Sequence, residues 1–222
     1  MKKLLITIDG PAGAGKTTVS RKLAARLGYT YIDTGALYRA VAYEAQAKGI
    51  SASDDEGLGK LCNGLEIMFV GTEKGLRLIC NHVDITDRIR TPEITMLASA
   101  VSARPVVRNY LLGLQRDMGR AKGVVFEGRD MGTVVFPEAD VKFFLDASTE
   151  TRARRRYNEL TTMDSITLEE VEADIKRRDN SDSTRDLAPL KPAADAIRID
   201  STTMPVQEVV DRMISYIANF YR

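Results

Sequence analysis

The sequence predicts an α/β fold in which a parallel sheet is flanked by helices. Short apolar runs that are typical of strands alternate with segments of helical periodicity, and this alternation favours a parallel sheet covered on both faces. Two segments depart from the alternation, residues 51–90 and the highly charged, helical residues 149–185. The predicted strands of the sheet are residues 4–9, 29–32, 123–126, 141–145 and 196–199.

The predicted helices follow from the spacing of apolar residues. Residues 16–27 and 34–48 each place their apolar side chains on one helical face, so both are expected to pack against other elements. Residues 92–103 and 105–120 are predicted as two further helices, the second with a proline in its first turn.

Residues 51–90 are predicted to form a small antiparallel insertion. Two apolar runs, residues 65–70 and 76–80, flank a segment rich in turn-forming residues, Gly71-Thr72-Glu73-Lys74-Gly75. We expect this insertion to contain no catalytic side chain.

The composition excludes several classes of function. The 222 residues carry 32 basic and 31 acidic side chains, so no global charge favours a nucleic-acid or membrane-surface partner. Cys62 and Cys80 are too few for a disulfide framework, and the single histidine, His82, makes a zinc site difficult to assemble. The first apolar run ends at Asp9, too early for a signal peptide or a membrane helix. We expect a cytoplasmic monomer that binds neither nucleic acid nor membranes.

A glycine-rich motif joins the first predicted strand to the first predicted helix. It matches G-x-x-x-x-G-K-[ST] at every fixed position with Gly10-Pro11-Ala12-Gly13-Ala14-Gly15-Lys16-Thr17. The glycines let successive backbone N–H groups point at one anion, in front of the positive end of the helix dipole. Lys16 supplies a mobile cation for the β- and γ-phosphates of ATP, and the Thr17 hydroxyl is suited to ligate Mg²⁺. We expect these residues and Thr18 to bind the nucleotide.

The motif leaves the phosphate acceptor open, and a GTPase switch is one alternative. Such a switch carries N-K-x-D for guanine, whereas the nearest segment, Asn81-His82-Val83-Asp84, has histidine in place of lysine. A D-x-x-G match at residues 54–57 falls in a segment that we interpret as a polar loop. A small-molecule kinase is therefore favoured.

Two arginines follow predicted strands of the sheet. Arg39 lies at the end of the loop after residues 29–32, and Arg129 lies just after residues 123–126. Ligands of α/β proteins bind at the carboxyl ends of the strands, and a guanidinium binds phosphate oxygens bidentately while keeping its charge. We expect the two arginines to hold a monophosphate, with a surface ion pair as the alternative for each.

Three further segments carry a resemblance to a known family. They are Asp33-Thr34-Gly35-Ala36-Leu37-Tyr38-Arg39, Glu127-Gly128-Arg129-Asp130-Met131-Gly132-Thr133-Val134-Val135-Phe136-Pro137 and Leu187-Ala188-Pro189-Leu190. With them the chain resembles the bacterial cytidylate kinases from Ile6 to the C-terminal helix. The resemblance implies the fold of the P-loop nucleoside monophosphate kinases and transfer of the γ-phosphate of ATP to CMP or dCMP.

The same resemblance implies a division of the chain. Core segments comprise residues 1–50, which include the start of the monophosphate-binding region, residues 122–149 and residues 189–222. Residues 51–121 form the monophosphate-binding region with its insertion, and residues 150–188 form a helical lid.

Roles for individual residues follow from the resemblance. It assigns base recognition to Ser99, Arg108 and Asp130, ribose recognition to Arg178 and Asp182, and further substrate contacts to Thr34, Tyr38 and Arg185. An aspartate that accepts from cytosine N4, with an arginine donating to N3 or O2, attracts cytosine and repels the carbonyl of uracil. Outside the motif, Asp130 would be interpreted as a cap or turn residue. Lys16, Arg129 and Arg178 are the expected catalytic cations.

Glu127 is the expected metal-site carboxylate, together with Thr17. Relatives commonly have aspartate at this position, and a water-mediated contact to Mg²⁺ accommodates the extra methylene of glutamate. We expect direct in-line transfer with no general base, because the attacking phosphate oxygen is already ionised near neutral pH. The rival enzyme is a P-loop kinase for UMP or shikimate, in which Asp130 and Arg108 have no cytosine to bind.

Four arginines of the charged segment admit three interpretations. They form a solvated helix face, a nucleic-acid surface, or part of a lid that closes over ATP and excludes water. We favour the lid, since nearby glutamates weaken a nucleic-acid surface. The arginines are Arg152, Arg154, Arg155 and Arg156.

Overall fold

The chain divides into two compact units in the computed structural model, which describes residues 2–73, 75–160 and 166–220. One unit combines Met1–Ile32 with Gly119–Arg222, and the other is Asp33–Met118. Residue 74 of the predicted turn, residues 161–165 of the predicted lid, and residues 1 and 221–222 of the predicted core segments lie outside the described residues. The functional division into core, monophosphate-binding region and lid stays a prediction.

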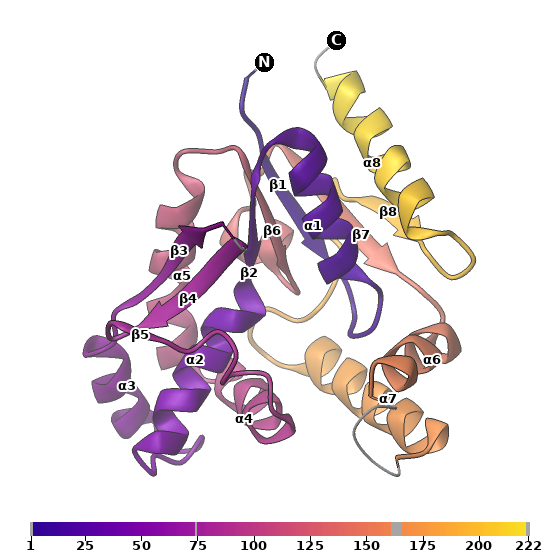
Figure 1. The fold of residues 1–222 in the computed structure, drawn as a ribbon. Helices are drawn as coiled ribbons and strands as arrows, with labels where there is room; N and C mark the ends of the chain where they lie inside the picture. The colour runs from indigo at the N-terminus through magenta and orange to yellow at the C-terminus, as the bar shows by residue number, and fades with distance from the viewer. Residues whose placement is uncertain (1, 74, 161–165, 221–222) are drawn as a thin grey trace. The chain divides into compact units, whose positions relative to one another are not determined.

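The first unit is built on a five-stranded sheet with the order β2-β6-β1-β7-β8 (Figure 1). β1 pairs in parallel with β6 and β7, and β7 pairs in parallel with β8. These pairings confirm the predicted parallel sheet. The non-sequential strand order agrees with them, because parallel neighbours must be joined by crossover connections. The strands are β1 (Leu5–Asp9), β2 (Thr30–Asp33), β6 (Val124–Gly128), β7 (Val141–Asp146) and β8 (Ile197–Asp200).

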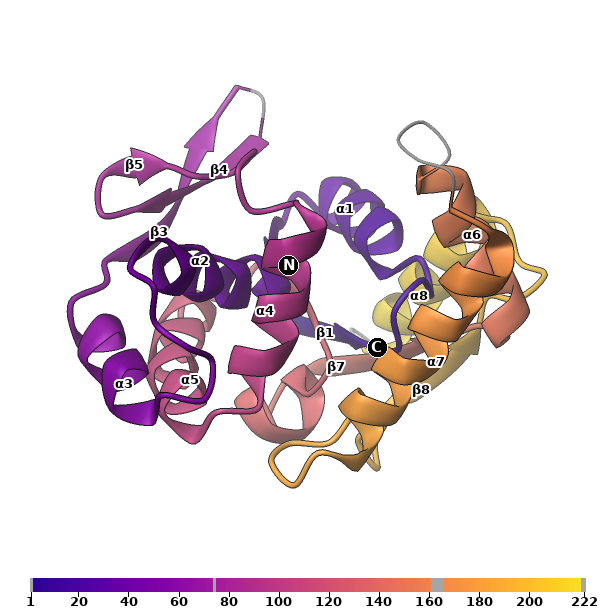
Figure 2. The same ribbon diagram turned by 90° about the horizontal axis from the view of Figure 1, so that it is seen from below.

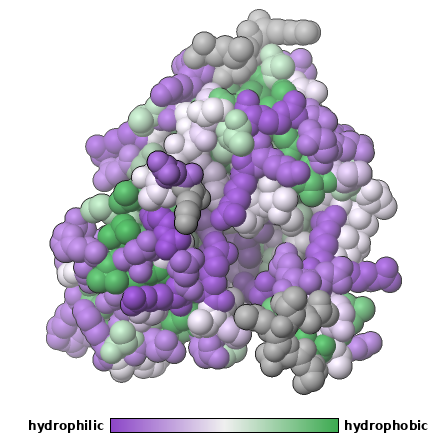
Figure 3. Space-filling model, viewed as in Figure 1, coloured by the Kyte–Doolittle hydropathy of each residue, from purple (hydrophilic) through white to green (hydrophobic). Residues whose placement is uncertain are grey.

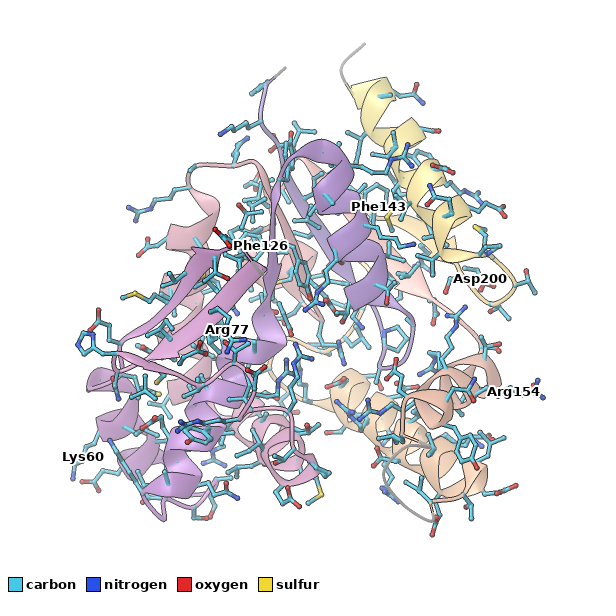
Figure 4. The ribbon with its side chains drawn as sticks, viewed as in Figure 1. Lys60, Arg77, Phe126, Phe143, Arg154 and Asp200 are labelled. Carbon is cyan, nitrogen blue, oxygen red and sulfur yellow. The ribbon has the colours of Figure 1, made fainter. Side chains whose placement is uncertain are left out.

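Two helices, α1 (Lys16–Leu27) and α8 (Val206–Phe220), pack with the sheet in one apolar core. Ile6 and Ile8 of β1 are fully buried in this core, as strand alternation requires of one face. Phe143 of β7 belongs to it (Figure 4). Phe126 of β6 packs against Phe136 with ring centroids 4.5 Å apart and the two planes tilted by 43°. The predicted helix 16–27 is confirmed with the same bounds.

A pair of helices, α6 (Thr149–Leu160) and α7 (Leu168–Thr184), lies side by side in both ribbon views (Figures 1 and 2). Ala153 of α6 and Val171 and Ile175 of α7 form a small apolar core of their own. Thr167 begins α7 with a capping box, in which its side chain and that of Glu170 each accept from the other's backbone N–H. The helices in the described part of the chain include none that is both long and apolar enough to cross a membrane.

A single π-helical turn, η1 (Met131–Val135), follows β6 and was not predicted from the sequence. The backbone N–H groups of Val134 and Val135 both donate to Asp130 O, and Phe136 N donates to Met131 O at 2.7 Å. Such turns are rare and occur frequently at functional sites.

The second unit contains the predicted antiparallel insertion, with strand order β3-β4-β5. One of its helices, α3, was not predicted, and the interpretation of residues 54–57 as a polar loop was wrong. Asp54 caps this helix by accepting from Gly57 N at 2.8 Å. The elements of this unit are α2 (Thr34–Ala47), α3 (Asp55–Asn63), β3 (Ile67–Thr72), β4 (Gly75–Cys80), β5 (Val83–Asp84), α4 (Pro92–Ser102) and α5 (Pro105–Gly119), which ends at the boundary.

The two cysteines are free thiols in the core of the second unit. Burial raises the pKa of Cys62 to about 11 and that of Cys80 to about 12. The side chain of His82 is 84% exposed and lies 3.6 Å from Glu66. Cys80 and His82 therefore do not converge on one site.

Candidate active site

The glycine-rich loop runs from the end of β1 to the start of α1, as predicted. Gly10 has a φ of +151°, and a Cβ there would lie 2.0 Å from the backbone oxygen of Leu145 in β7. Gly15 is the N-cap of α1 with a φ of +88°. Both positions therefore require glycine, one for close approach and one for a left-handed backbone. The loop places the N-terminus of α1 behind any anion that it binds.

Lys16, the first residue of α1, is only 4% exposed. Its Nζ donates to the Pro11 backbone oxygen at 2.7 Å. Burial and the positive charge of Arg129 lower the pKa of Lys16 to about 7. An anionic phosphate in the loop would favour the charged form of this lysine.

The two predicted metal ligands lie within hydrogen-bond distance of each other. Thr17 Oγ1 donates to Glu127 Oε1 at 2.9 Å, and the hydroxyl of Tyr31 donates to Glu127 Oε2 at 2.5 Å. A hydroxyl and a carboxylate are oxygen ligands of the kind Mg²⁺ takes. Within residues 2–73, 75–160 and 166–220, no three His, Cys, Asp or Glu side chains gather into a metal-binding group. A cation at this pair would need most of its ligands from nucleotide phosphates and water.

A charged cluster joins the loop after β6 to α7. Arg129 Nε donates to Asp182 Oδ2 at 2.8 Å. Arg185 lies 3.6 Å from Asp130 and 4.0 Å from Asp182. Arg178 interacts electrostatically with Arg129 and Asp182. The structure thus brings together all five substrate residues that were predicted in this unit.

The pKa shifts of this cluster reflect burial and mutual charge. Burial and the neighbouring Arg129 lower the pKa of Arg178. Burial also disfavours the charged forms of Arg129 and Asp182. Attraction between the two opposite charges outweighs this effect of burial, so the pKa of Arg129 is raised and that of Asp182 is lowered. An excess of guanidiniums held beside two carboxylates is suited to an anionic ligand.

The second unit holds the other predicted substrate residues. Arg39 lies in the second turn of α2, so its predicted place at the end of a loop was wrong. Asp33 caps α2 by accepting from Ala36 N and also accepts from Arg39 Nη2 at 2.7 Å. Arg90 lies 3.6 Å from the same carboxylate. Thr34 is the first residue of α2 and is buried.

The Arg108 side chain contacts the ring of Tyr38 and the backbone of Ser102, which is hydrogen-bonded through its hydroxyl to the backbone of Ser99. The guanidinium of Arg108 lies 5.8 Å from the ring centroid of Tyr38, and its Nη1 donates to Ser102 O at 3.1 Å. Ser102 Oγ donates in turn to Ser99 O at 2.8 Å. These contacts hold the Arg108 guanidinium over an aromatic face at the start of α5.

The four arginines of α6 do not form one charged face. Arg152 is 4% exposed; it donates to Ala12 O at 3.0 Å and lies 2.7 Å from Asp179 of α7. Arg155 donates to Ser201 O at 2.6 Å. Arg154 extends into solvent, on a surface that is hydrophilic around α6 (Figures 3 and 4). Two of the four therefore contact the phosphate loop or the residue after β8, and the interpretation of the four as part of a lid stays a prediction.

Arg152→Ala is expected to destabilise the protein by about 3 kcal/mol. The change removes the buried guanidinium that forms an ion pair with Asp179 and donates a hydrogen bond to the Ala12 carbonyl. Urea unfolding measures the loss. The matched control, Arg154→Ala, removes an exposed i,i+4 pair with Glu150 and should cost less than about 1 kcal/mol. Equal effects of the two variants would contradict a role for Arg152 in stabilising the phosphate loop.

Sequence reasoning missed two polar residues that contact this site, Asp9 and Tyr31, and assigned a third, Arg152, to a lid without its contact with the phosphate loop. Asp9 ends β1 and accepts two backbone N–H groups of η1. Tyr31 binds Glu127, and Arg152 binds the loop. Only Asp9 carried a local signal, since it is a charged residue at the end of a buried strand, directly before the glycine-rich loop.

The loop, the lysine and the parallel sheet define a P-loop kinase. Solved structures with this fold include a shikimate kinase from Bacteroides thetaiotaomicron, with a TM-score of 0.50 and 14% identity over 98% of this chain and 99% of that one. An uncharacterized protein from Eubacterium ventriosum gives a TM-score of 0.54 and 12% identity over 97% and 99% of the two chains. At these identities the likeness shows the fold alone.

The sequence comparisons specify the family. A family model described as cytidylate kinase matches residues 6–219. The cytidylate kinases of Geobacter sulfurreducens and Citrifermentans bemidjiense are 54% and 52% identical over 215 residues, covering 96% of this chain and 92% of each relative. That of Pseudomonas fluorescens is 46% identical over 221 residues, covering 98% and 96%. The chain belongs to the cytidylate kinase family.

Proposed function

We propose that the chain transfers the γ-phosphate of ATP to CMP or dCMP and releases ADP with CDP or dCDP. The observation that carries the proposal is the family match over residues 6–219, in a chain whose phosphate loop lies between β1 and α1. A GTPase switch is not favoured, since Asn81 and His82 lie in the connection between β4 and β5 of the insertion.

The loop of residues 10–18 binds the phosphates of ATP. Its backbone N–H groups and the N-terminus of α1 favour an anion, and Lys16 leaves the Pro11 carbonyl to follow the γ-phosphate. Because the pKa of Lys16 is lowered in the free protein, phosphate binding favours its protonation and thereby the cation that the transition state needs.

Thr17 and Glu127 would hold Mg²⁺ on the nucleotide. Their oxygens already share one hydrogen bond, and Tyr31 fixes the second oxygen of Glu127. When bound, Mg²⁺ neutralises phosphate charge and orients the γ-phosphate. The protein's own part is to keep the threonine hydroxyl and the carboxylate on one side of the phosphate loop.

The charged cluster of the first unit binds the acceptor. Arg129 and Arg178 offset the charge of the transferring phosphoryl group, while Asp182 orients Arg129 and binds the ribose. Asp130 accepts from cytosine N4, and Arg185 lies beside it in the substrate pocket. No general base is involved, because the attacking phosphate oxygen is already ionised.

Further contacts with CMP are proposed for residues of α2, α4 and α5. Arg39 and Thr34 bind its phosphate at the start of α2, and Arg108 and Ser99 bind the base. Tyr38 supports the guanidinium of Arg108. Residues 150–188 act as a lid, and the enzyme works as a monomer without nucleic acid or membrane.

The reaction is tested by measuring ADP release with ATP against CMP, dCMP, UMP and shikimate. We expect CMP or dCMP to give the highest kcat/KM, and omission of Mg²⁺ to abolish release. A preference for UMP or shikimate would refute the proposal.

A further inference from the structure

The guanidinium of Arg152 joins three parts of the first unit. Arg152 lies in the first turn of α6, and its side chain is 5% exposed. Its Nε donates to Ala147 O at 2.9 Å, just after β7, and its Nη1 donates to Ala12 O of the phosphate loop at 3.0 Å. Its Nη2 donates to Thr149 Oγ1 at 3.0 Å and lies 2.7 Å from Asp179 Oδ2 of α7. Every nitrogen of the planar fork therefore has a partner.

The bond to Ala12 fixes one peptide plane of the phosphate loop. In this trans peptide the carbonyl of Ala12 and the N–H of Gly13 point in opposite directions, so a carbonyl held toward α6 turns the N–H away from α6. The contact is close, because a Cβ on Gly13 would lie 3.0 Å from Arg152 Cβ. Successive N–H groups of this kind are the donors with which a phosphate loop binds an anion. Arg152 therefore holds the orientation of one such donor.

A second carbonyl of the loop is also held by side chains from outside it. Ser201 Oγ, directly after β8, donates to Ala14 O at 3.2 Å, and Arg155 Nη1 donates to the same oxygen at 3.5 Å. The carbonyls of Ala12 and Ala14 are thus both turned toward fixed donors. Ser201 links the loop to the sheet, and Arg152 links it to α7 as well.

Asp179 connects this arrangement to the helix that carries part of the charged cluster. It follows Arg178 in α7 and precedes Asp182 by about one helical turn. A buried ion pair is often no more stabilising than apolar side chains of the same volume, whereas its directional hydrogen bonds fix a geometry. The place of the Arg152 guanidinium, and with it the orientation of the Ala12 carbonyl, therefore depends on α7.

We propose that Arg152 is a positioning residue for nucleotide binding, which holds the peptide between Ala12 and Gly13 in the orientation that binds phosphate and makes this orientation depend on Asp179. The inference rests on the proposed function only in that the phosphate loop binds a nucleotide. Arg152 acts through a loop carbonyl, and the loop N–H groups bind the phosphate. A side chain that served stability alone would leave the affinity for nucleotide unchanged.

Binding of ADP with Mg²⁺, measured by isothermal titration calorimetry, tests the inference without turnover. The variants are Arg152→Met, Asp179→Asn and the double variant, each as the full chain and below the midpoint of its thermal unfolding. Arg152→Met keeps most of the volume but loses the bond to Ala12, so the Kd for ADP should rise by about tenfold, the effect of misaligning about one hydrogen-bond donor.

The second half of the cycle tests the dependence on α7. Asp179→Asn should raise the Kd for ADP by about fourfold, because the guanidinium loses its charged partner. In the Arg152→Met background the same change should alter the Kd by less than about 1.5-fold, since the group through which it acts is gone.

The matched control is Arg26→Met, which breaks an exposed pair with Asp211 and should leave the Kd for ADP at the wild-type value. An unchanged Kd in folded Arg152→Met overturns the inference, as do effects of the two changes that multiply independently. Should Arg152→Met not fold, Arg152→Lys keeps the charge but not the fork, and a Kd within about twofold of wild type in that variant overturns it too. If ADP binding responds as expected but CMP is not phosphorylated, the proposed function fails and the role of Arg152 stands.

Discussion

Lys16→Ala is expected to lower kcat by about a hundredfold or more, the usual effect of losing one preorganised group that stabilises transition-state charge. Lys16 is the one cation that the phosphate loop itself supplies, and its Nζ lies on the loop carbonyl of Pro11 in the free protein. The measurement is kcat with saturating ATP and CMP. A variant that keeps more than about a tenth of wild-type kcat, a loss under roughly 1.4 kcal/mol, would contradict the role.

The control for this prediction separates charge from folding. Lys22→Ala removes an exposed lysine from the same helix and should leave kcat unchanged.

Because the folded protein lowers the pKa of Lys16, the unfolded chain binds more protons between about pH 7 and 10, and stability linked to Lys16 rises with pH across that window. Lys16→Met removes the buried charge, so at pH 7 we expect it to melt no lower than wild type.

Asp130→Asn is expected to reduce the ratio of kcat/KM for CMP over UMP by about tenfold or more, since a base contact discriminates by roughly 1 to 3 kcal/mol. The amide presents a donor where the carboxylate offered an acceptor, so cytosine loses a charge-assisted hydrogen bond and uracil loses a repulsion. The variant should also be slower with CMP, while its KM for ATP changes little. Steady-state kinetics with both nucleotides provide the measurement.

Asp211→Asn makes the same chemical change on α8, where the carboxylate is exposed and pairs with Arg26. It should leave the CMP to UMP ratio at the wild-type value. An equal ratio in the Asp130 variant and in wild type would remove Asp130 from the base pocket and leave it as the N-cap position of η1.

The phosphate loop was predictable because its determinants are consecutive. Glycines, lysine and threonine at fixed spacing specify the loop, and the apolar periodicity of residues 16–27 gave the helix its bounds. The parallel sheet followed from similar local patterns. Helix α3 was missed because only nine residues form it and two of them are glycines, which disfavour helices.

The contacts that were missed depend on residues far apart in the chain. Asp9 binds η1 across 122 positions, and Arg152 binds Ala12 across 140. No local pattern distinguishes Arg152 from Arg154, although one is buried and the other exposed. Asp130 occupies the N-cap position of η1, but the carboxylate that accepts from the first N–H groups of η1 is that of Asp9 in β1. Burial and long-range partners, which single-sequence patterns do not encode, decide such roles.

The sheet topology sets an order of events on the ribosome. Among the described strands, β1 pairs only with β6 and β7. Leu5 of β1 can therefore pair with its partner in β6, Val124, only after Val124 has been synthesised. Roughly 120 residues must be synthesised between them, which takes about 6 to 24 s at the usual rates of translation. Throughout that interval the nascent strand β1 has no native strand partner in the sheet, whereas the contiguous unit Asp33–Met118 emerges whole. The inserted unit is therefore free to fold before the unit that surrounds it in sequence, and the newly made N-terminal segment is the part that needs protection by chaperones.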